Sequence, residues 1–152
     1  INENISLLVI GGSQGAKIFG KIVPPAIREL KKKGYTLEVN QQCTKDQKNS
    51  ISQYYEENSI TNNIFEFDSN ILKLLLSTDL AITRCGASTT AELAYTRTPF
   101  IAVPLPDSID NHQHLNAQYY NDNGFCWLLE ENNFNTNNLS NLIIEIFKKK
   151  IS

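Results

Sequence analysis

Six short apolar runs alternate with helical repeats along this chain, and that alternation constrains its fold more than any other feature. Short runs rich in β-branched residues suit strands that are buried on both faces. Strands that alternate with helices form a parallel sheet with right-handed crossovers. We therefore predict an α/β, Rossmann-like domain of three layers around a six-stranded parallel sheet. The predicted strands cover residues 5–10, 36–40, 63–67, 80–83, 99–104 and 125–129.

Helical patterns separate these strands. The first of them ends at Gly34, which we expect to be a C-cap. Pro24 and Pro25 interrupt this pattern, so we expect the helix to be kinked or split into two pieces. The segment 71–76 should form a short buried helix. The other predicted helices cover residues 45–58, 89–96, 112–121 and 139–151.

Composition excludes several classes of function. A chain of 152 residues forms one domain with a sizeable core. Its formal net charge is −2, and its basic runs are only Lys31–Lys33 and Lys148–Lys150, which argues against nucleic-acid binding. Both runs end predicted helices, where the helix dipole favours cations. The sequence has no signal peptide and no apolar stretch long enough to span a membrane, so we expect peripheral membrane contact at most.

The cysteines and the two ends of the chain give further expectations. Cys43, Cys85 and Cys126 are too far apart for a Cys-x-x-Cys motif, and an odd count predicts reduced thiols in the cytoplasm. The chain starts almost directly on a strand, contains no methionine, and stops in an amphipathic helix without a C-cap. We therefore expect it to be a piece of a longer chain.

Ligands of such sheets bind at the carboxyl ends of the strands, so the loops after strands one, three, four and five are the informative ones. The first loop, Gly11–Gly15, is glycine-rich but matches neither standard phosphate-binding motif. Glu38, the only acid on the second strand, lies mid-strand, which argues against a dinucleotide. The loop is either a phosphate-approach turn or a tight turn that needs positive φ.

The loop after the fourth strand, residues 84–89, consists of small residues and opens a helix. Free backbone N–H groups and the positive end of the dipole make such a turn a site for an anion. Glu92, one turn further on, would repel phosphate, so we interpret it as an acceptor for sugar hydroxyls. Arg84 either neutralises a diphosphate or anchors the strand end to an acid such as Asp107 or Asp110.

The remaining two loops are less specific. Asp68-Ser69-Asn70 reads most simply as a helix cap. After the fifth strand, His112 and His114 point to different faces of a helix, so we expect no metal site. Gln113 and Asn116 share a face that suits hydrogen bonding to an uncharged polyol or amide. Capping of that helix by Asp110 or Asn111 explains its start equally well.

Together these motifs resemble the MurG family of peptidoglycan glycosyltransferases, and the resemblance covers nearly the whole chain. The matching stretches are residues 8–17, Arg84-x-Gly86-Ala87-x-Thr89-x-x-Glu92, residues 99–104 and Asp110-x-His112-Gln113-x-x-Asn116-Ala117. The resemblance implies the C-terminal half of a GT-B fold, with residues 1–152 as the donor nucleotide-sugar-binding domain. The acceptor-binding N-terminal domain and the final C-terminal helices of that family would lie outside this chain.

The resemblance also implies an activity. Such an enzyme moves GlcNAc from UDP-GlcNAc to undecaprenyl-pyrophosphoryl-MurNAc-pentapeptide (lipid I), forming lipid II with inversion to a β-1,4 linkage and without a metal or other cofactor. It serves peptidoglycan synthesis, and with it cell shape and division, from the cytoplasmic face of the bacterial inner membrane. The lipid acceptor and the catalytic residues would belong to the N-terminal half, so this chain alone is expected to bind donor without turnover.

Each site residue is carried over by position. Backbone around Phe67 and Asp68 would read the uracil edge. Glu92 would accept hydrogen bonds from the ribose, and His112, Gln113 and Asn116 would hold the GlcNAc hydroxyls. The residues facing the diphosphate would be Gly12, Ser13, Ala87, Ser88 and Thr89, with Arg84 beside them.

The sequence departs from the family at Asp68 and Ser88, where apolar residues are usual, and in the length of the loop 106–109. These departures concern the contacts to uracil and sugar. Two alternatives stay open. One is the donor subunit of a split, eukaryotic-type GlcNAc transferase that docks to a membrane partner. The other is a non-catalytic nucleotide-binding remnant.

Overall fold

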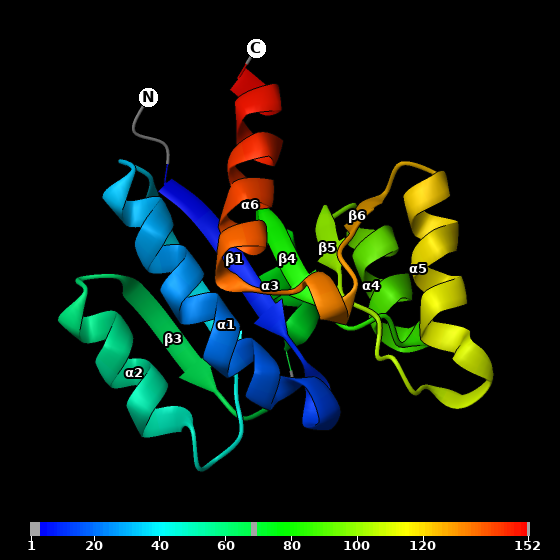
Figure 1. Cartoon of the computed structure of the whole chain (residues 1–152), viewed down its shortest axis with the longest axis horizontal. Helices are drawn as coiled ribbons and strands as arrows, with labels where there is room; N and C mark the ends of the chain where they lie inside the picture. Colours follow the sequence, from blue (N-terminus) through cyan, green and yellow to red (C-terminus); the bar gives the residue numbers. More distant parts are fainter. Residues whose placement is uncertain (1–3, 68–69, 152) are drawn as a thin grey trace.

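The computed structural model describes residues 4–67 and 70–151 as one six-stranded parallel sheet between two layers of helices (Figure 1). The strand order is β3-β2-β1-β4-β5-β6. The predicted α/β architecture is therefore confirmed. The strands are β1 (Asn4–Ile10), β2 (Thr36–Gln42), β3 (Thr61–Phe65), β4 (Leu80–Thr83), β5 (Phe100–Ala102) and β6 (Cys126–Leu128).

The helices divide between the two faces of the sheet because side chains alternate along each strand. Leu7 of β1 packs in one core cluster with α1, α2 and α6, and Leu8 packs in the other with α3, α4 and α5. Both leucines are completely buried, as expected for a strand with helices on both sides. The helices are α1 (Gly12–Lys32), α2 (Lys48–Glu57), α3 (Ile71–Leu76), α4 (Ala87–Thr96), α5 (His112–Asp122) and α6 (Thr136–Ile151).

Helix α1 is one helix, so the prediction that Pro24 and Pro25 split it was wrong. Each proline removes a backbone donor and costs a helix interior about 3 kcal/mol. Val23 before the prolines and Ile27 after them are completely buried in the same core cluster. Burying each of these side chains contributes roughly 1.5–3 kcal/mol, so the packing on both sides of the prolines offsets their cost. The C-cap of α1 is Lys33, one residue earlier than predicted, and Gly34 follows it with the positive φ of 97° that ends the helix.

Several element boundaries differ from those predicted. Strand β3 runs from Thr61 to Phe65, two residues earlier than expected, which leaves Phe67 in the loop after the strand. Helix α4 starts at Ala87, and α1 starts at Gly12, so most of the glycine-rich segment is helical. In α3 only Leu75 is buried, which contradicts the prediction of a buried helix.

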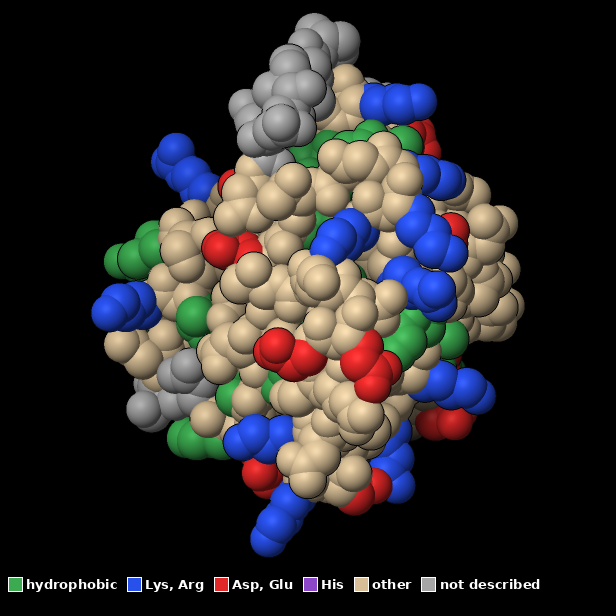
Figure 2. All heavy atoms as spheres, turned by 90° about the vertical axis from the view of Figure 1, so that its left-hand side faces the viewer, with side chains coloured by type: hydrophobic (Ala, Val, Ile, Leu, Met, Phe, Trp, Pro, Cys, Tyr) green, Lys and Arg blue, Asp and Glu red, His purple; other side chains and the backbone are tan. Residues whose placement is uncertain are grey.

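The lysine run at the end of α1 has a structural use. Lys31 Nζ donates to the carbonyl oxygens of Asn58 (2.7 Å) and Ser59 (2.6 Å), which follow the end of α2. Lys32 lies 3.7 Å from the carboxylate of Glu29 on its own helix. Figure 2 shows basic side chains along one side of the face that includes α1 and α2, with acidic side chains among and below them. Lys31 thus satisfies carbonyl oxygens at the end of a neighbouring helix, whereas Lys32 pairs with a carboxylate on its own helix.

Candidate functional site

A pocket of about 210 Å³ opens at the carboxyl edge of the sheet, where β1 and β4 end side by side. The chain builds β1, β2 and β3 outward on one side and β4, β5 and β6 outward on the other. The strand order therefore reverses between β1 and β4, and ligands of open α/β sheets bind at such a reversal. The pocket is lined by Ile10, Gly11, Gly12, Thr83, Arg84, Gly86, Thr89, Leu105 and Gln113.

Helix α1 begins at this pocket with an unusual backbone. Gly12 has a φ of 64°, a conformation that favours glycine, and an added Cβ would meet no atom within 4 Å. The positive φ is therefore what selects glycine here. Gly11 provides no side-chain cap; instead Gly12 N–H donates to Gln42 Oε1 at 2.9 Å, from the end of β2. The backbone of Ser13 lies in the first turn of α1, and its side chain is outside what the structure describes.

Helix α4 begins on the other side of the pocket. Gly86 is extended, with φ −64° and ψ 149°, and turns the chain from β4 into the helix. Ala87 and Ser88 are exposed and Thr89 is half-buried at the pocket wall. First-turn N–H groups of a helix have no acceptor within it. Two helix N-termini thus converge on one pocket, and their dipoles favour an anion there.

Glu92 lies one turn into α4, as predicted, beside this helix start. The side chain is half-buried, and Ser88 Oγ donates to its Oε1 at 3.2 Å. Glu92 does not line the pocket itself, so its carboxylate stands next to the anion-binding position and not inside it. This arrangement avoids direct repulsion of an anion and keeps acceptor oxygens free at the rim.

Arg84 anchors the end of β4, but neither Asp107 nor Asp110 is its partner, and that expectation was wrong. Its Nη2 forms an ion pair with Glu131, in a 3-10 turn after β6, and its Nη1 donates to the carbonyls of Val103 and Pro104 at 3.3 Å. The guanidinium also lies 5.4 Å from the ring centroid of Phe19. Its charge is therefore already paired beside the pocket.

Gln113 and Asn116 do share one face of α5, as predicted. Both side chains form hydrogen bonds to the loop that precedes α4. Gln113 Oε1 accepts from the backbone N–H groups of Cys85 (3.1 Å) and Leu105 (2.9 Å). Asn116 Nδ2 donates to the carbonyl of Cys85 (3.0 Å) and to Thr90 Oγ1 (3.2 Å). Most hydrogen bonds of the two side-chain amides therefore go to backbone groups of the protein and do not point into the pocket. Within the described residues no hydrogen bond occupies the NH₂ group of Gln113, which lines the pocket.

The two histidines point in different directions, as the sequence predicted. His112 Nδ1 lies 2.8 Å from the carbonyl oxygen of Ile109 and is exposed, whereas His114 Nε2 lies 3.4 Å from Glu130. In residues 4–67 and 70–151, no group of three or more His, Cys, Asp or Glu is arranged to hold a metal ion. Asp110 and Asn111 both have positive φ, and the N-cap residue Asn111 makes no side-chain cap to α5; instead Gln113 N–H in the first turn donates to Ser108 Oγ at 3.2 Å.

The buried thiols are chemically inert. Cys43, Cys85 and Cys126 are free and buried. Burial raises the pKa of Cys85 and of Cys126 to about 12, so both thiols are protonated at neutral pH. A protonated thiol is a weak nucleophile. Cys85 lies in the loop at the pocket but does not supply a reactive group there.

Phe67 stands at the same edge of the sheet, after β3, with 81% of its surface exposed. Asp68, the other residue predicted to contact uracil, lies outside the described residues. Gln42 was missed by the sequence reasoning, although its side chain joins the start of α1 to the loop after β3. Its position as the last residue of the second strand was the available signal, because strand ends at this edge face the ligand.

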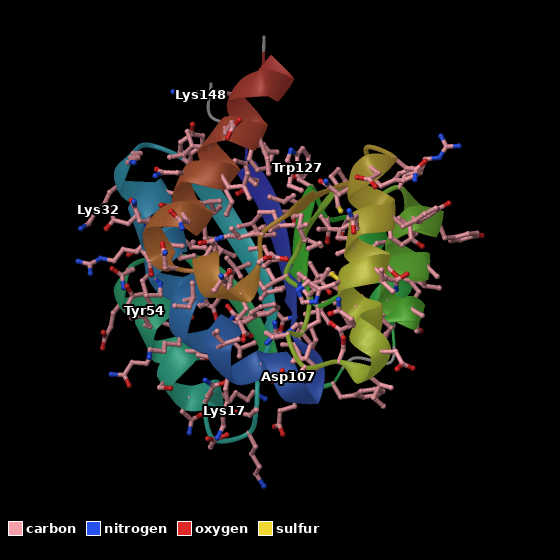
Figure 3. All side chains as sticks on the ribbon, turned by 45° about the vertical axis from the view of Figure 1, so that its right-hand side comes forward. Lys17, Lys32, Tyr54, Asp107, Trp127 and Lys148 are labelled. Carbon is pink, nitrogen blue, oxygen red and sulfur yellow. The ribbon has the colours of Figure 1, made fainter. Side chains whose placement is uncertain are left out.

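A larger hollow of about 570 Å³ lies at the amino ends of β5 and β6, lined by residues that include Leu93, Phe100, Phe125 and Trp127. Figure 3 shows Trp127 and Lys148 near one end of the molecule and Asp107 and Lys17 near the other. This hollow lacks convergent helix N-termini, so the smaller pocket is the better candidate site. None of the described helices is long and apolar enough to cross a membrane.

Comparison with known proteins agrees with this reading. Residues 6–152 match the glycosyltransferase family 28 C-terminal domain. The chain is 45% identical over 148 residues to the UDP-N-acetylglucosamine–N-acetylmuramyl-(pentapeptide) pyrophosphoryl-undecaprenol N-acetylglucosamine transferase of Pelagibacter ubique, covering 97% of this chain and 41% of that protein. It is 40% identical over 152 residues to the enzyme of the same name from Rickettsia prowazekii, covering 98% of this chain and 40% of that protein.

Among solved structures, MurG of Acinetobacter baumannii superposes with a TM-score of 0.85 at 28% identity, covering 95% of this chain and 43% of that one. The chain thus spans about two fifths of the length of these curated relatives. The family match covers nearly all of the chain, and it coincides with the sheet and the pocket described above. This chain belongs to glycosyltransferase family 28, whose C-terminal domain it matches.

Proposed function

We propose that this domain binds UDP-N-acetylglucosamine at the carboxyl edge of its sheet and serves as the donor half of an inverting glycosyltransferase. The observation that carries the proposal is the convergence of the α1 and α4 N-termini on one pocket with Glu92 at its rim. Backbone N–H groups and helix dipoles suit a diphosphate, and a carboxylate beside them suits ribose hydroxyls. A simple anion site would have no use for that carboxylate.

In this proposal, different residues contact different parts of the nucleotide sugar. The start of α1 at Gly12 and Ser13, and the first-turn amides of α4 (Ala87, Ser88, Thr89), face the diphosphate; because Gly12 N–H already donates to Gln42, the donors of α1 are the amides that follow it. Glu92 accepts from the ribose, and the backbone at Phe67 and Asp68 reads the uracil edge. His112 and the NH₂ group of Gln113 face the GlcNAc, whereas Asn116 and Arg84 act by holding the α4 loop and the end of β4.

The chemistry of this half is electrostatic. When the bond between GlcNAc and UDP breaks, negative charge develops on the leaving diphosphate, and preorganised N–H donors stabilise that charge. The domain uses no metal or other cofactor in this proposal, because the helix ends supply the positive potential. The acceptor nucleophile and its base come from outside this chain.

The whole protein then transfers GlcNAc to undecaprenyl-pyrophosphoryl-MurNAc-pentapeptide, lipid I, in peptidoglycan synthesis. The name of the Pelagibacter relative, which covers both donor and acceptor, supports this assignment. The lipid-linked acceptor meets the N-terminal half at the cytoplasmic face of the inner membrane, where the protein is peripheral. Residues 1–152 form the donor domain, and the acceptor domain precedes them in the full protein.

Titration calorimetry with UDP and UDP-GlcNAc tests the donor site. We expect dissociation constants in the micromolar to millimolar range and a loss of about tenfold in the Glu92→Ala variant, since two hydrogen bonds to ribose are worth about that factor. Glu57→Ala, on the exposed surface of α2, is the matched control and should bind like the wild type. Binding of another nucleotide in preference to UDP by the folded chain would disprove the proposal.

The upstream reading frame and the activity of the full-length protein distinguish this proposal from the two alternatives, a split transferase and a non-catalytic remnant. An acceptor domain encoded upstream in the same reading frame dismisses a split enzyme with a separate membrane subunit. Transfer of GlcNAc to a lipid I analogue by the full-length protein dismisses a non-catalytic remnant. A full-length protein that binds UDP-GlcNAc but transfers nothing would favour the remnant.

A further inference from the structure

We propose that Gln42 is a positioning residue that fixes the start of α1 to the loop after β3, and so holds the two walls of the nucleotide site at a set separation. This inference rests on the proposed function for the identity of the two walls. The wall at α1 faces the diphosphate, and the wall at the β3 loop faces the base.

The geometry is that of a bridge. Gln42 ends β2, the strand that pairs with β1 on one side and with β3 on the other. Its Oε1 accepts from Gly12 N–H at 2.9 Å, and its Nε2 donates to the carbonyl oxygen of Glu66 at 3.2 Å. One carboxamide therefore uses its acceptor on one loop and its donor on the other. Figure 1 shows the arrows of β1 and β3 ending at the same edge of the sheet, near the start of α1.

The bridge replaces a local helix cap. The residue before α1 is Gly11, which has no side chain to bind the first amides of the helix. Gln42 supplies that acceptor from 30 residues away. Gly12 also has a positive φ at this first position of the helix. A residue with no donor could cap the helix equally well but would leave the carbonyl of Glu66 unattached.

The Gln42 bridge should raise the affinity mainly for ligands that contact both walls of the site. With the bridge in place, UDP meets diphosphate and base contacts that are already spaced for it, so little ordering is required on binding. Pyrophosphate meets only the α1 and α4 ends, and uridine meets only the base and ribose contacts. Loss of the bridge should therefore weaken UDP more than either fragment.

Gln42→Met tests this, because methionine has a similar length and shape but no hydrogen bonds. We expect UDP affinity to fall about tenfold while the affinities for pyrophosphate and for uridine, followed by NMR shifts, change less than about twofold. Gln42→Glu keeps an acceptor for Gly12 but sets a carboxylate against the carbonyl oxygen of Glu66 and near the diphosphate, so UDP binding should fall at least as far. Gln53→Met on α2 is the matched control and should bind all three ligands like the wild type.

The outcomes separate this inference from the proposed function. Failure of the wild type to bind UDP would overturn the proposed function, whereas the bridge is tested without ligand by the hydrogen exchange of the Gly12 amide. That exchange should be faster in Gln42→Met than in the wild type. Unchanged exchange, unchanged UDP binding in either Gln42 variant, or an equal loss for all three ligands would overturn the bridge.

Discussion

The two helix starts at the pocket are held in different ways. Among the side chains that the structure describes, Gln42 holds the α1 start, together with the positive φ of Gly12. The α4 start is held on both sides of Cys85, by the amides of Gln113 and Asn116 and by the ion pair of Arg84. The comparison teaches that similar anion-binding ends can be preorganised to different degrees: in the described part of the chain several side chains hold the α4 end, whereas Gln42 alone holds the α1 end.

The strongest test of this contrast is Arg84→Met. Removing the guanidinium leaves Glu131 without its partner and the carbonyls of Val103 and Pro104 without a donor. We expect the free energy of unfolding to fall by about 3 kcal/mol, measured by chemical denaturation. Arg28→Met, on the exposed side of α1, should change it by less than about 0.5 kcal/mol. A similar small change for Arg84→Met would show that the α4 start needs no ion pair.

Gln113→Met should have the next largest effect. It removes the acceptor of two backbone N–H groups, those of Cys85 and Leu105, and should cost about 2 kcal/mol of stability. Gln113→Glu keeps an acceptor oxygen for both groups, so its stability should recover towards the wild type. UDP-GlcNAc affinity should not recover, because the carboxylate has no NH₂ donor and repels the diphosphate. Full recovery of binding in Gln113→Glu would remove Gln113 from the sugar contacts.

Gly12→Ala probes the weaker of the two helix starts. The added Cβ has open space, so the whole cost is the left-handed backbone, about 1 kcal/mol. Thermal or chemical denaturation would measure it, with Gly86→Ala as the matched control. Gly86 has a negative φ and free space for a Cβ, so the Gly86→Ala variant should lose less stability than Gly12→Ala. An equal loss at both positions would mean that φ is not what selects Gly12.

The smallest effect per residue is expected at alkaline pH and involves the α4 side. Cys85 and Cys126 have pKa values of about 12 in the folded protein, raised by burial from an ordinary value of 9.0. The unfolded chain therefore loses these protons first, and stability is complete below pH 9 and declines as the pH rises towards 12. The decline should be roughly 1 kcal/mol or less per thiol at pH 9.5.

Denaturation curves of the wild type and of the Cys85→Ala/Cys126→Ala variant at pH 8 and 9.5 give the contribution of the thiols by difference. The wild type should lose more stability than the variant over this interval. An identical loss in both proteins would assign the alkaline decline to other groups.

Much of this arrangement was predictable because it depends on local pattern. The alternation of apolar runs and helical repeats gave the order of the elements, and with it the prediction that Gly12, Thr89 and Gln113 approach one another. Contacts that join distant segments were not predictable. Arg84 meets Glu131 across 47 positions and Gln42 meets Gly12 across 30, and nothing near either residue in the sequence selects its partner.

The continuity of α1 through Pro24 and Pro25 was not predicted, for a related reason. Proline rules describe a helix in isolation, whereas Val23 and Ile27 are buried on either side of the prolines by the sheet and by α6. The roles of Gln113 and Asn116 were likewise read from residue type alone. Their shared face was right, but the structure directs most of their hydrogen-bonding capacity to the backbone of the α4 loop.

The strand order has a consequence for folding as well as for binding. Residues up to Phe65 build one half of the sheet and residues from Leu80 onward build the other, and within the sheet the two halves are joined where β1 pairs with β4. A ligand in the pocket at that junction touches both halves, so its binding free energy opposes their separation. Nucleotide should therefore make the two halves unfold as a single cooperative unit and slow amide exchange along β1 and β4 together.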